Sequence, residues 1–280
     1  MQIVHSIAEL RKTVKKWKSE GQSIGLVPTM GFLHEGHESL ILKAVSQNDR
    51  VIVSDFVNPT QFAPNEDFES YPRDINKDAA LCERAGADII FNPSPEEMYH
   101  DPKVHMVADE LSEKLCGKTR PIHFGGVCTV VSKLFNIAQP DRAYFGQKDA
   151  QQLIIIRKMV LDMNFDIEIV GCPIIREADG LAKSSRNTYL SAEEREQALC
   201  LSKAIEIAKS MIAEGERRAA EVISVMARIV VSNPLARIDY ISAVDPADLE
   251  DTETLTDGTL VAMAVYIGKT RLIDNFIVGE

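Results

Sequence analysis

The 280-residue sequence predicts an α/β fold, with a parallel sheet in its N-terminal part and a smaller α+β domain after it. As far as residue 172, short apolar runs alternate with segments whose apolar residues recur at helical spacing. After the turn dipeptide Asp179-Gly180, the pattern changes to consecutive helices and then consecutive strands. The length fits two domains, which we place at 1–175 and 176–280.

Five runs in the first part have the length and apolar content of buried strands: residues 24–27, 50–57, 88–91, 142–145 and 167–170. Apolar residues at helical spacing predict helices around 40–45 and 156–163. Strands that alternate with helices imply right-handed crossovers in a parallel sheet. Ligands bind such sheets at the carboxyl ends of the strands, so we expect a site just after Val27, Val57 and Phe145.

The second part begins with two predicted helices. Ser191 and Glu194 have the spacing of a capping box and predict the start of a long helix. A second helix is predicted over 219–231. Three strand-like runs follow, at 238–244, 260–267 and 272–277, and acidic turns separate them.

The composition is that of a soluble globular protein, 45% hydrophobic and 26% charged, which excludes disordered and fibrous classes. The formal net charge of −11 argues against nucleic acid as a partner, because phosphate binding needs clustered Lys and Arg. No apolar segment is long enough for a membrane span, and no secretory signal is visible. Five Cys residues without a Cys-x-x-Cys pair are typical of reduced thiols. We therefore expect a cytoplasmic protein without a membrane partner.

The first candidate segment runs from Pro28 to His37, between a predicted strand and a predicted helix. Gly31 and Gly36 allow close backbone approach to a ligand, and the helix N-terminus offers unpaired N–H groups. His34 and His37 are three residues apart, so both could face one anion and supply a proton to it. The alternative is a pair of exposed polar residues in a turn.

Two further segments carry cations beside turns. In the segment from Tyr144 to Asp149, Lys148 could reach a phosphate, and Asp149 could cap a helix or bind a ribose hydroxyl. Gln152 has capping-box spacing to Asp149, so helix capping is its alternative role. The segment from Lys183 to Asn187 suits a loop that closes on a nucleotide, although a solvated linker has the same composition.

Two uncharged or mixed segments complete the candidates. Residues 56–62 carry the amides of Asn58 and Gln61, which suit the recognition of hydroxyl and carboxylate groups. Residues 120–126 include Arg120 and His123, and they are a further candidate contact for an anion.

Several common motifs are excluded. Gly268-Lys269-Thr270 ends like a P-loop, but Met263 stands where the earlier glycine is required. The second His of a zinc-protease helix would have to be at position 38, which is Glu38. The sequence also contains no dinucleotide-binding glycine pattern and no esterase nucleophile motif.

These motifs together resemble those of the HIGH-type nucleotidylyltransferase superfamily. Pro28 to His37 is similar to its HIGH motif, in a His-Glu-Gly-His form, and Lys183 to Arg186 is similar to its KMSKS-type loop. With residues 56–62, 146–149 and 184–187 included, nearly the whole chain resembles the pantothenate synthetase (pantoate–β-alanine ligase) family. The resemblance implies a Rossmann-like N-terminal domain that carries the site, a smaller C-terminal α+β lid domain, and a homodimer.

The resemblance also implies the reaction and the site residues. D-pantoate would condense with β-alanine through a pantoyl adenylate, with ATP consumed, Mg²⁺ required, and AMP and pyrophosphate released. The residues at ATP would be Met30, Gly31, Phe32, Leu33, His34, Glu35, Gly36, His37, Gly146, Gln147, Lys148, Asp149, the backbone of Ile175, Lys183, Ser184, Ser185 and Arg186. Catalysis would rest on His37 as proton donor, with His34, Lys148 and Arg186.

Gln61 and Gln152 would bind pantoate, and Gln61 with Asn58 would meet β-alanine. The sequence indicates no ligands for Mg²⁺. Two alternatives remain at this stage: another HIGH-type nucleotidyl transferase, or a nucleotide-binding module without catalytic activity.

Overall fold

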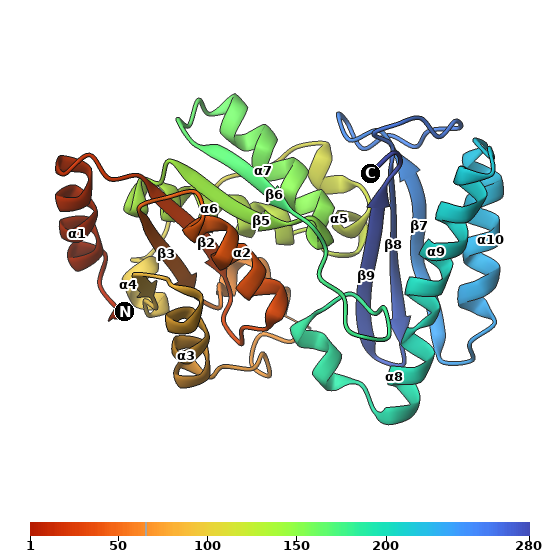
Figure 1. Cartoon of the computed structure of the whole chain (residues 1–280), viewed down its shortest axis with the longest axis horizontal. Coiled ribbons are helices and arrows are strands. Elements are labelled where there is room, and N and C mark those ends of the chain that lie inside the picture. Colours follow the sequence, from red (N-terminus) through yellow and green to blue (C-terminus); the bar gives the residue numbers. More distant parts are fainter. Residues whose placement is uncertain (65) are drawn as a thin grey trace. The chain divides into compact units, whose positions relative to one another are not determined.

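The computed structural model describes residues 1–64 and 66–280, and its chain divides into two compact units (Figure 1). Unit 1 comprises residues 1–113, 117–147 and 155–173. Unit 2 comprises residues 114–116, 148–154 and 174–280. Two short segments that precede residue 155 therefore belong to the unit that is built mainly from the C-terminal part of the sequence.

Unit 1 contains a six-stranded sheet in which every strand pairing described is parallel. Its order is β1-β4-β3-β2-β5-β6. The strands are β1 (Gln2–Val4), β2 (Ile24–Thr29), β3 (Arg50–Asp55), β4 (Ile89–Phe91), β5 (Arg142–Gly146) and β6 (Glu168–Cys172). The central strands β2 and β3 are mostly buried, as expected of a sheet covered on both faces.

Helices connect these strands: α1 (Ile7–Ser19), α2 (Glu35–Val45), α3 (Ile75–Ala85), α4 (Pro95–Met98), α5 (Cys116–Thr119), α6 (His123–Ala138) and α7 (Ala150–Asp162). Short 3₁₀ turns lie at η1 (Pro59–Gln61), η2 (Leu111–Glu113) and η3 (Gln147–Asp149). Val27 and Val53 pack into one core cluster with residues of α2 and α3, and Figure 1 shows α2 lying over β2. Because strand side chains alternate, Leu26 and Ile52 face the opposite side, where α6 packs against β2 and α1.

Unit 2 is built around a three-stranded antiparallel sheet, β7-β8-β9, with strands β7 (Ala236–Val244), β8 (Leu260–Ile267) and β9 (Thr270–Ile277). Its helices are α8 (Ala192–Ala198), α9 (Cys200–Ala213) and α10 (Ala219–Val231), preceded by the 3₁₀ turn η4 (Ser185–Tyr189). α9 and α10 lie side by side along the sheet (Figure 1). Ile205, Met226 and Val265 are fully or nearly fully buried in the core between helices and sheet.

The predicted fold class is confirmed: a parallel sheet is followed by a small separate antiparallel sheet with helices. The helix predicted from Ser191 is not continuous, because the chain leaves helical hydrogen bonding at Leu199 between α8 and α9. The capping box at Ser191 and Glu194 is present. Three-residue β1 was not predicted, since a run that short shows no period. Among the described residues, no helix is both long and apolar enough to cross a bilayer.

Candidate active site

The candidate segments of unit 1 meet at one edge of its sheet. β2 pairs with β3 on one side and with β5 on the other, so the strand order changes direction beside β2. The carboxyl ends of these strands, at Thr29, Asp55 and Gly146, all point to the same edge because the strands are parallel. Such a switch point is where open parallel sheets bind ligands, as the sequence predicted for this sheet.

The loop after β2 has an unusual backbone conformation. Gly31 has a φ of +80°, and a Cβ atom there would lie 2.3 Å from a carboxyl oxygen of Asp55. Phe32 also lies in the left-handed region, with a φ of +51°, which is rare for a residue with a side chain. The Thr29 hydroxyl accepts the Gly31 N–H at 3.2 Å and donates to the carbonyl of Ser54 at 2.7 Å. The loop is therefore fixed to the ends of both β2 and β3.

A buried carboxylate on α3 holds the next two residues of this loop. Asp78 accepts the Phe32 N–H at 2.7 Å and the Leu33 N–H at 2.6 Å, one on each carboxyl oxygen. Burial raises the pKa of Asp78, and these two N–H groups act against that shift. Burial, the charge of Asp78 and a hydrogen bond to it raise the pKa of Asp55 to about 7. Burial therefore raises the pKa of both carboxyls, and that of Asp55 also because Asp78 is close.

The two histidines cap the helix that follows the loop. His34 is the N-cap of α2, and its Nδ1 accepts the N–H of Gly36 at 3.1 Å. His37 Nδ1 accepts the N–H of His34 at 3.3 Å, and the two rings stack with their centroids 4.1 Å apart. Because each Nδ1 accepts, each neutral ring carries its hydrogen on Nε2. The two rings form a reciprocal cap and are half-buried, so they are not a pair of exposed polar residues in a turn.

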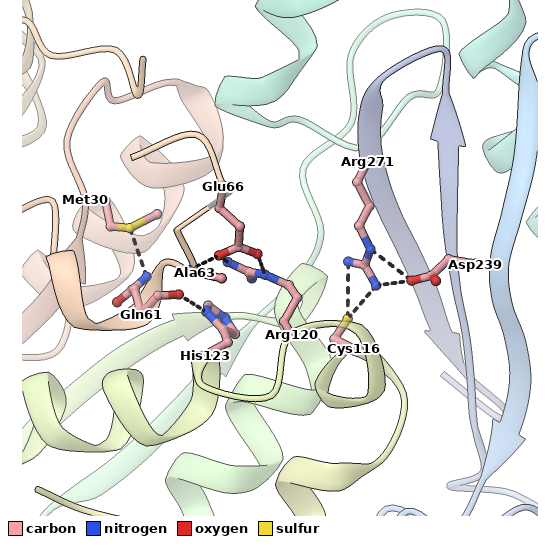
Figure 2. Close-up of polar contacts among 9 residues, drawn as sticks. All are labelled: Met30, Gln61, Ala63, Glu66, Cys116, Arg120, His123, Asp239 and Arg271. Atoms are coloured by element: carbon pink, nitrogen blue, oxygen red, sulfur yellow. Dashed lines mark hydrogen bonds and ion pairs between the residues drawn. The ribbon is translucent and has the colours of Figure 1, made fainter. Parts of the chain in front are cut away.

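Gln61 has a fixed amide orientation. Its Nε2 donates to the Met30 sulfur at 3.0 Å, and its Oε1 accepts from Asn58 Nδ2 at 3.1 Å. Figure 2 shows Gln61 between Met30 and His123, whose Nδ1 lies 3.1 Å from the Gln61 carbonyl oxygen. Tyr99 donates to Asn58 Oδ1 at 2.7 Å. The amide N–H end of Gln61 therefore faces only a weak acceptor, a thioether, in these contacts.

Arg120 is already paired with a carboxylate. Its Nη2 donates to Glu66 Oε2 at 3.0 Å and its Nε donates to the other oxygen, so the contact is bidentate (Figure 2). Burial acts to raise the pKa of Glu66, but the hydrogen bonds and charge of Arg120 outweigh it and the pKa is lowered. Arg120 thus pairs with a carboxylate of the protein itself, and its contact with a ligand anion stays a prediction.

Lys148, Asp149 and Gln152 follow β5 and belong to unit 2. Lys148 Nζ lies 3.7 Å from Asp149 Oδ2, and the Lys148 carbonyl accepts from Asn275 Nδ2 on β9 at 2.9 Å. The predicted cap between Asp149 and Gln152 is not among the contacts of the described residues. Gly146 and Gln147 remain in unit 1, and an added Cβ at Gly146 would meet no described atom within 4 Å.

The predicted Lys183–Arg186 loop is anchored within unit 2. The Lys183 N–H donates to the Ile175 carbonyl at 2.9 Å, which places Ile175 beside the start of this loop. Ser184 caps the turn η4 by accepting the Arg186 N–H at 3.3 Å. Ser185 is buried.

The sheet of unit 2 also holds the segment 114–116. Arg271 on β9 donates to Asp239 at 2.7 Å and to the Cys116 sulfur at 3.5 Å (Figure 2). This contact joins residues 155 positions apart in the sequence, so local composition could not have predicted it.

Met30, the 31–37 loop, Asn58, Gln61, Gly146 and Gln147 thus lie in unit 1, whereas Lys148, Asp149, Gln152, Ile175 and Lys183–Arg186 lie in unit 2. Sequence reasoning missed Asp55, Asp78, Tyr99 and Glu66, because a single acid or tyrosine has no distinctive local pattern. Asp78 has a weak signal, since it is an acid four residues after another acid, the helix cap Asp74. Within the described ranges, no group of three or more His, Cys, Asp or Glu side chains could hold a metal ion.

Comparison with known proteins shows the family of this chain. The sequence profile of the pantoate-beta-alanine ligase family matches residues 2–277. A pantothenate synthetase from Clostridium acetobutylicum is 57% identical over 277 residues, which is 99% of each chain. One from Clostridioides difficile is 57% identical over 275 residues, or 98% of each chain.

Solved structures show the same similarity. Pantothenate synthetase from Thermus thermophilus has a TM-score of 0.94 at 42% identity, and the match covers 99% of both chains. A pantoate-beta-alanine ligase from Francisella tularensis, solved in complex with beta-gamma ATP and beta-alanine, has a TM-score of 0.81 at 36% identity. That match covers 99% of this chain and 97% of the other. The profile, the sequence relatives and the solved structures agree over the whole length, so this chain belongs to the pantoate–β-alanine ligase family of enzymes.

Proposed function

We propose that this enzyme condenses D-pantoate with β-alanine in two steps at the expense of ATP. Pantoate and ATP first give pantoyl adenylate and pyrophosphate. The amine of β-alanine then displaces AMP to give pantothenate. The family supports the overall ligation, and the Francisella tularensis relative in complex with beta-gamma ATP and beta-alanine supports both small molecules as ligands.

The observation that carries this proposal is the cap at His34 and His37. Both Nδ1 atoms are occupied by backbone N–H groups, so both rings carry Nε2–H donors at the N-terminus of α2. Donors fixed in this way stabilise negative charge that builds on phosphate oxygens without having to reorganise. Without ATP, the positive end of the helix dipole favours neutral rings, which act as hydrogen-bond donors. The negative charge of a bound triphosphate favours the protonated ring, and we assign His37 in that form to proton donation to the leaving pyrophosphate.

In the first step, a carboxylate oxygen of pantoate attacks the α-phosphorus of ATP, and the bond from that phosphorus to the β-phosphate oxygen breaks. Lys148, Lys183 and Arg186 supply positive charge, and the backbone of residues 30–37 and 146–149 supplies donors. No protein nucleophile is required. The proposal requires that the residues of both units act on the same bound ATP, with unit 2 serving as a lid and the domains divided near residue 175.

Amides rather than a cation suit pantoate as a substrate. Gln61 presents an N–H to the Met30 sulfur, a weak acceptor that a hydroxyl or carboxylate oxygen would replace favourably. An Arg clamp would hold the carboxylate but withdraw the electron density it needs for attack. Gln152 supplies the second amide, and Asn58 with Gln61 meets β-alanine.

In the second step, the β-alanine nitrogen attacks the acyl carbon, the bond to the AMP oxygen breaks, and the nitrogen loses a proton. Exclusion of water during this step keeps the adenylate from hydrolysis.

Mg²⁺ belongs to the proposal as the counter-ion that ATP brings. A metal of this kind is held mainly by phosphate and water. We also propose a cytoplasmic homodimer.

A substrate-omission assay tests the proposal. Pyrophosphate should be released only with ATP and pantoate both present, and AMP should form at a comparable rate only when β-alanine is added. Release of pyrophosphate with another acceptor in place of pantoate would indicate a different HIGH-type transferase. Absence of release with all three substrates would indicate a module that binds nucleotide without turnover.

A further inference from the structure

Asp78 and Asp55 form a buried carboxyl pair beside the loop that precedes His34. Asp78 and Asp55 are 1% and 6% exposed, and they come from different elements, α3 and the end of β3. Asp78 uses one oxygen for each of two consecutive backbone N–H groups. The residues that carry those groups are Phe32 and Leu33, which directly precede the helix cap His34.

The loop is held against its own conformational preference. The left-handed backbone of Phe32 is unfavourable for a residue with a side chain, and it persists only where surrounding contacts fix it. The two bonds from Asp78 are such contacts, because they fix the N–H groups on both sides of the Phe32 carbonyl. The orientation of His34 and His37 at the end of this loop therefore depends on the position of the Asp78 carboxylate.

We propose that Asp78 is a positioning residue for the reaction, which holds the Phe32–Leu33 backbone, and that the neighbouring carboxyl of Asp55 keeps Asp78 in place. This inference rests on the proposed use of ATP by the same loop. Asp55 donates its hydrogen to Asp78, so one negative charge is shared among one O–H and two N–H donors. Loss of that proton puts two negative charges in contact and drives the carboxyls apart.

The other titratable and charged groups near the pair are few among the described residues. Asp74 on α3 is a further negative charge that acts on Asp78. Cys82 on α3 stays neutral because burial, followed by the charges of Asp78 and Asp55, raises the pKa of its thiol to about 12. Lys77 lies over the Phe32 ring, with Nζ 4.7 Å from the ring centroid. His34 and His37 follow on α2.

The test uses the full chain and compares Asp78→Asn and Asp55→Asn with the wild type. We expect Asp78→Asn to raise the KM for ATP at least tenfold, because an amide can accept only one of the two N–H groups well. In the wild type, the KM for ATP should rise at least fivefold between pH 6.5 and 8.5 as Asp55 ionises. In Asp55→Asn, which cannot ionise and still donates to Asp78, this rise should disappear. The substrates titrate in the same way with every variant, so the difference between the profiles isolates Asp55.

Asp74→Asn is the matched control. It removes a charge from the same helix and keeps a side chain that caps helices well, and the Asp74 carboxylate accepts the Lys77 N–H of α3 at 3.1 Å. We expect its KM for ATP to stay within twofold of the wild type. An equal rise of KM in Asp74→Asn and Asp78→Asn would overturn the proposal, because charge alone would then explain the effect.

Thermal unfolding without ligands supplies a readout that is independent of the reaction. A carboxyl whose pKa is raised on folding destabilises the protein increasingly as pH rises from about 4 through about 7. The melting temperature of Asp55→Asn relative to the wild type should therefore increase over that interval and level off above it. A pH-independent difference would overturn the role of the retained proton. If the wild type itself fails the substrate-omission assay while this pH-dependent difference is seen, the proposed function fails and not the carboxyl pair.

Discussion

At the scale of single residues, backbone contacts decide what each side chain can do. His34 and His37 would have two donor and acceptor arrangements each in solution, and the N–H groups of α2 select one. Gln61 is likewise oriented, by Asn58 at its oxygen and Met30 at its nitrogen. Arg120 is committed to Glu66. The residue types were visible in the sequence, whereas these partners were not.

Lys148 should matter for charge and not for folding. Its Nζ makes a 3.7 Å contact with Asp149, a partly exposed ion pair of the kind that contributes little to stability. We predict that Lys148→Ala lowers the rate of adenylate formation roughly 100- to 1,000-fold with a melting temperature close to that of the wild type. Single-turnover pyrophosphate release measures this rate, and a near-normal rate would remove Lys148 from the mechanism.

Two roles are proposed for Gln152, that of a pantoate ligand and that of a helix cap, and the Gln152→Ala variant distinguishes them. As a pantoate ligand it should, when changed to Ala, raise the KM for pantoate while the thermal stability stays nearly constant. As a helix cap it should instead lower stability by about 1 kcal/mol. Steady-state kinetics and a thermal melt on the same preparation distinguish them, and a stability loss without a KM change would reject the ligand role.

At the scale of elements, periodicity and turn signals located most of the fold. The runs at 24–27 and 142–145 became β2 and β5, and the three C-terminal runs became β7, β8 and β9. The apolar pattern found these strands because burial on both faces, or on one, determines their composition. The break at Leu199 escaped prediction, since no Gly or Pro marks it. The order of strands in the sheet followed only from pairing between distant segments.

The loop after β2 depends on the absence of a side chain at Gly31. Gly31→Ala would combine left-handed strain with a Cβ atom 2.3 Å from Asp55, so we predict a loss of about 2–4 kcal/mol and weaker ATP binding. Chemical denaturation measures the loss. Gly215→Ala is the control, because Gly215 also has a positive φ, +102°, but no described atom lies within 4 Å of its added Cβ. Equal losses in the two variants would show that crowding at Asp55 is unimportant.

At the scale of the whole molecule, neighbouring residues of one sequence motif belong to different units, and the order of the sequence does not reveal this division. Gly146 and Gln147 belong to unit 1, and Lys148 with Asp149 belongs to unit 2, although the four residues are consecutive. Asn275 on β9 and the contacts of Cys116 with Arg271 account for part of this division. These are long-range contacts, so a boundary near residue 175 was the most that local composition could predict.

Both units should respond to one nucleotide if the proposed function is right. We predict that ATP with pantoate slows amide hydrogen exchange in the 30–37 loop and also in the 183–187 loop, because each contributes to the same bound triphosphate. Mass spectrometry of the exchanged protein measures both loops in one experiment. Protection of the first loop alone would mean that unit 2 does not take part in nucleotide binding.

The reciprocal cap of α2 determines what must be included when the two histidines are engineered into another protein. The pair of imidazoles is useful because the surrounding peptide groups choose the nitrogen that keeps its hydrogen. Two histidines grafted at the same spacing onto an ordinary helix would interconvert between forms and lose that choice. The portable unit is therefore the whole turn, from the threonine that ends the strand to the second ring, together with the acid beneath it.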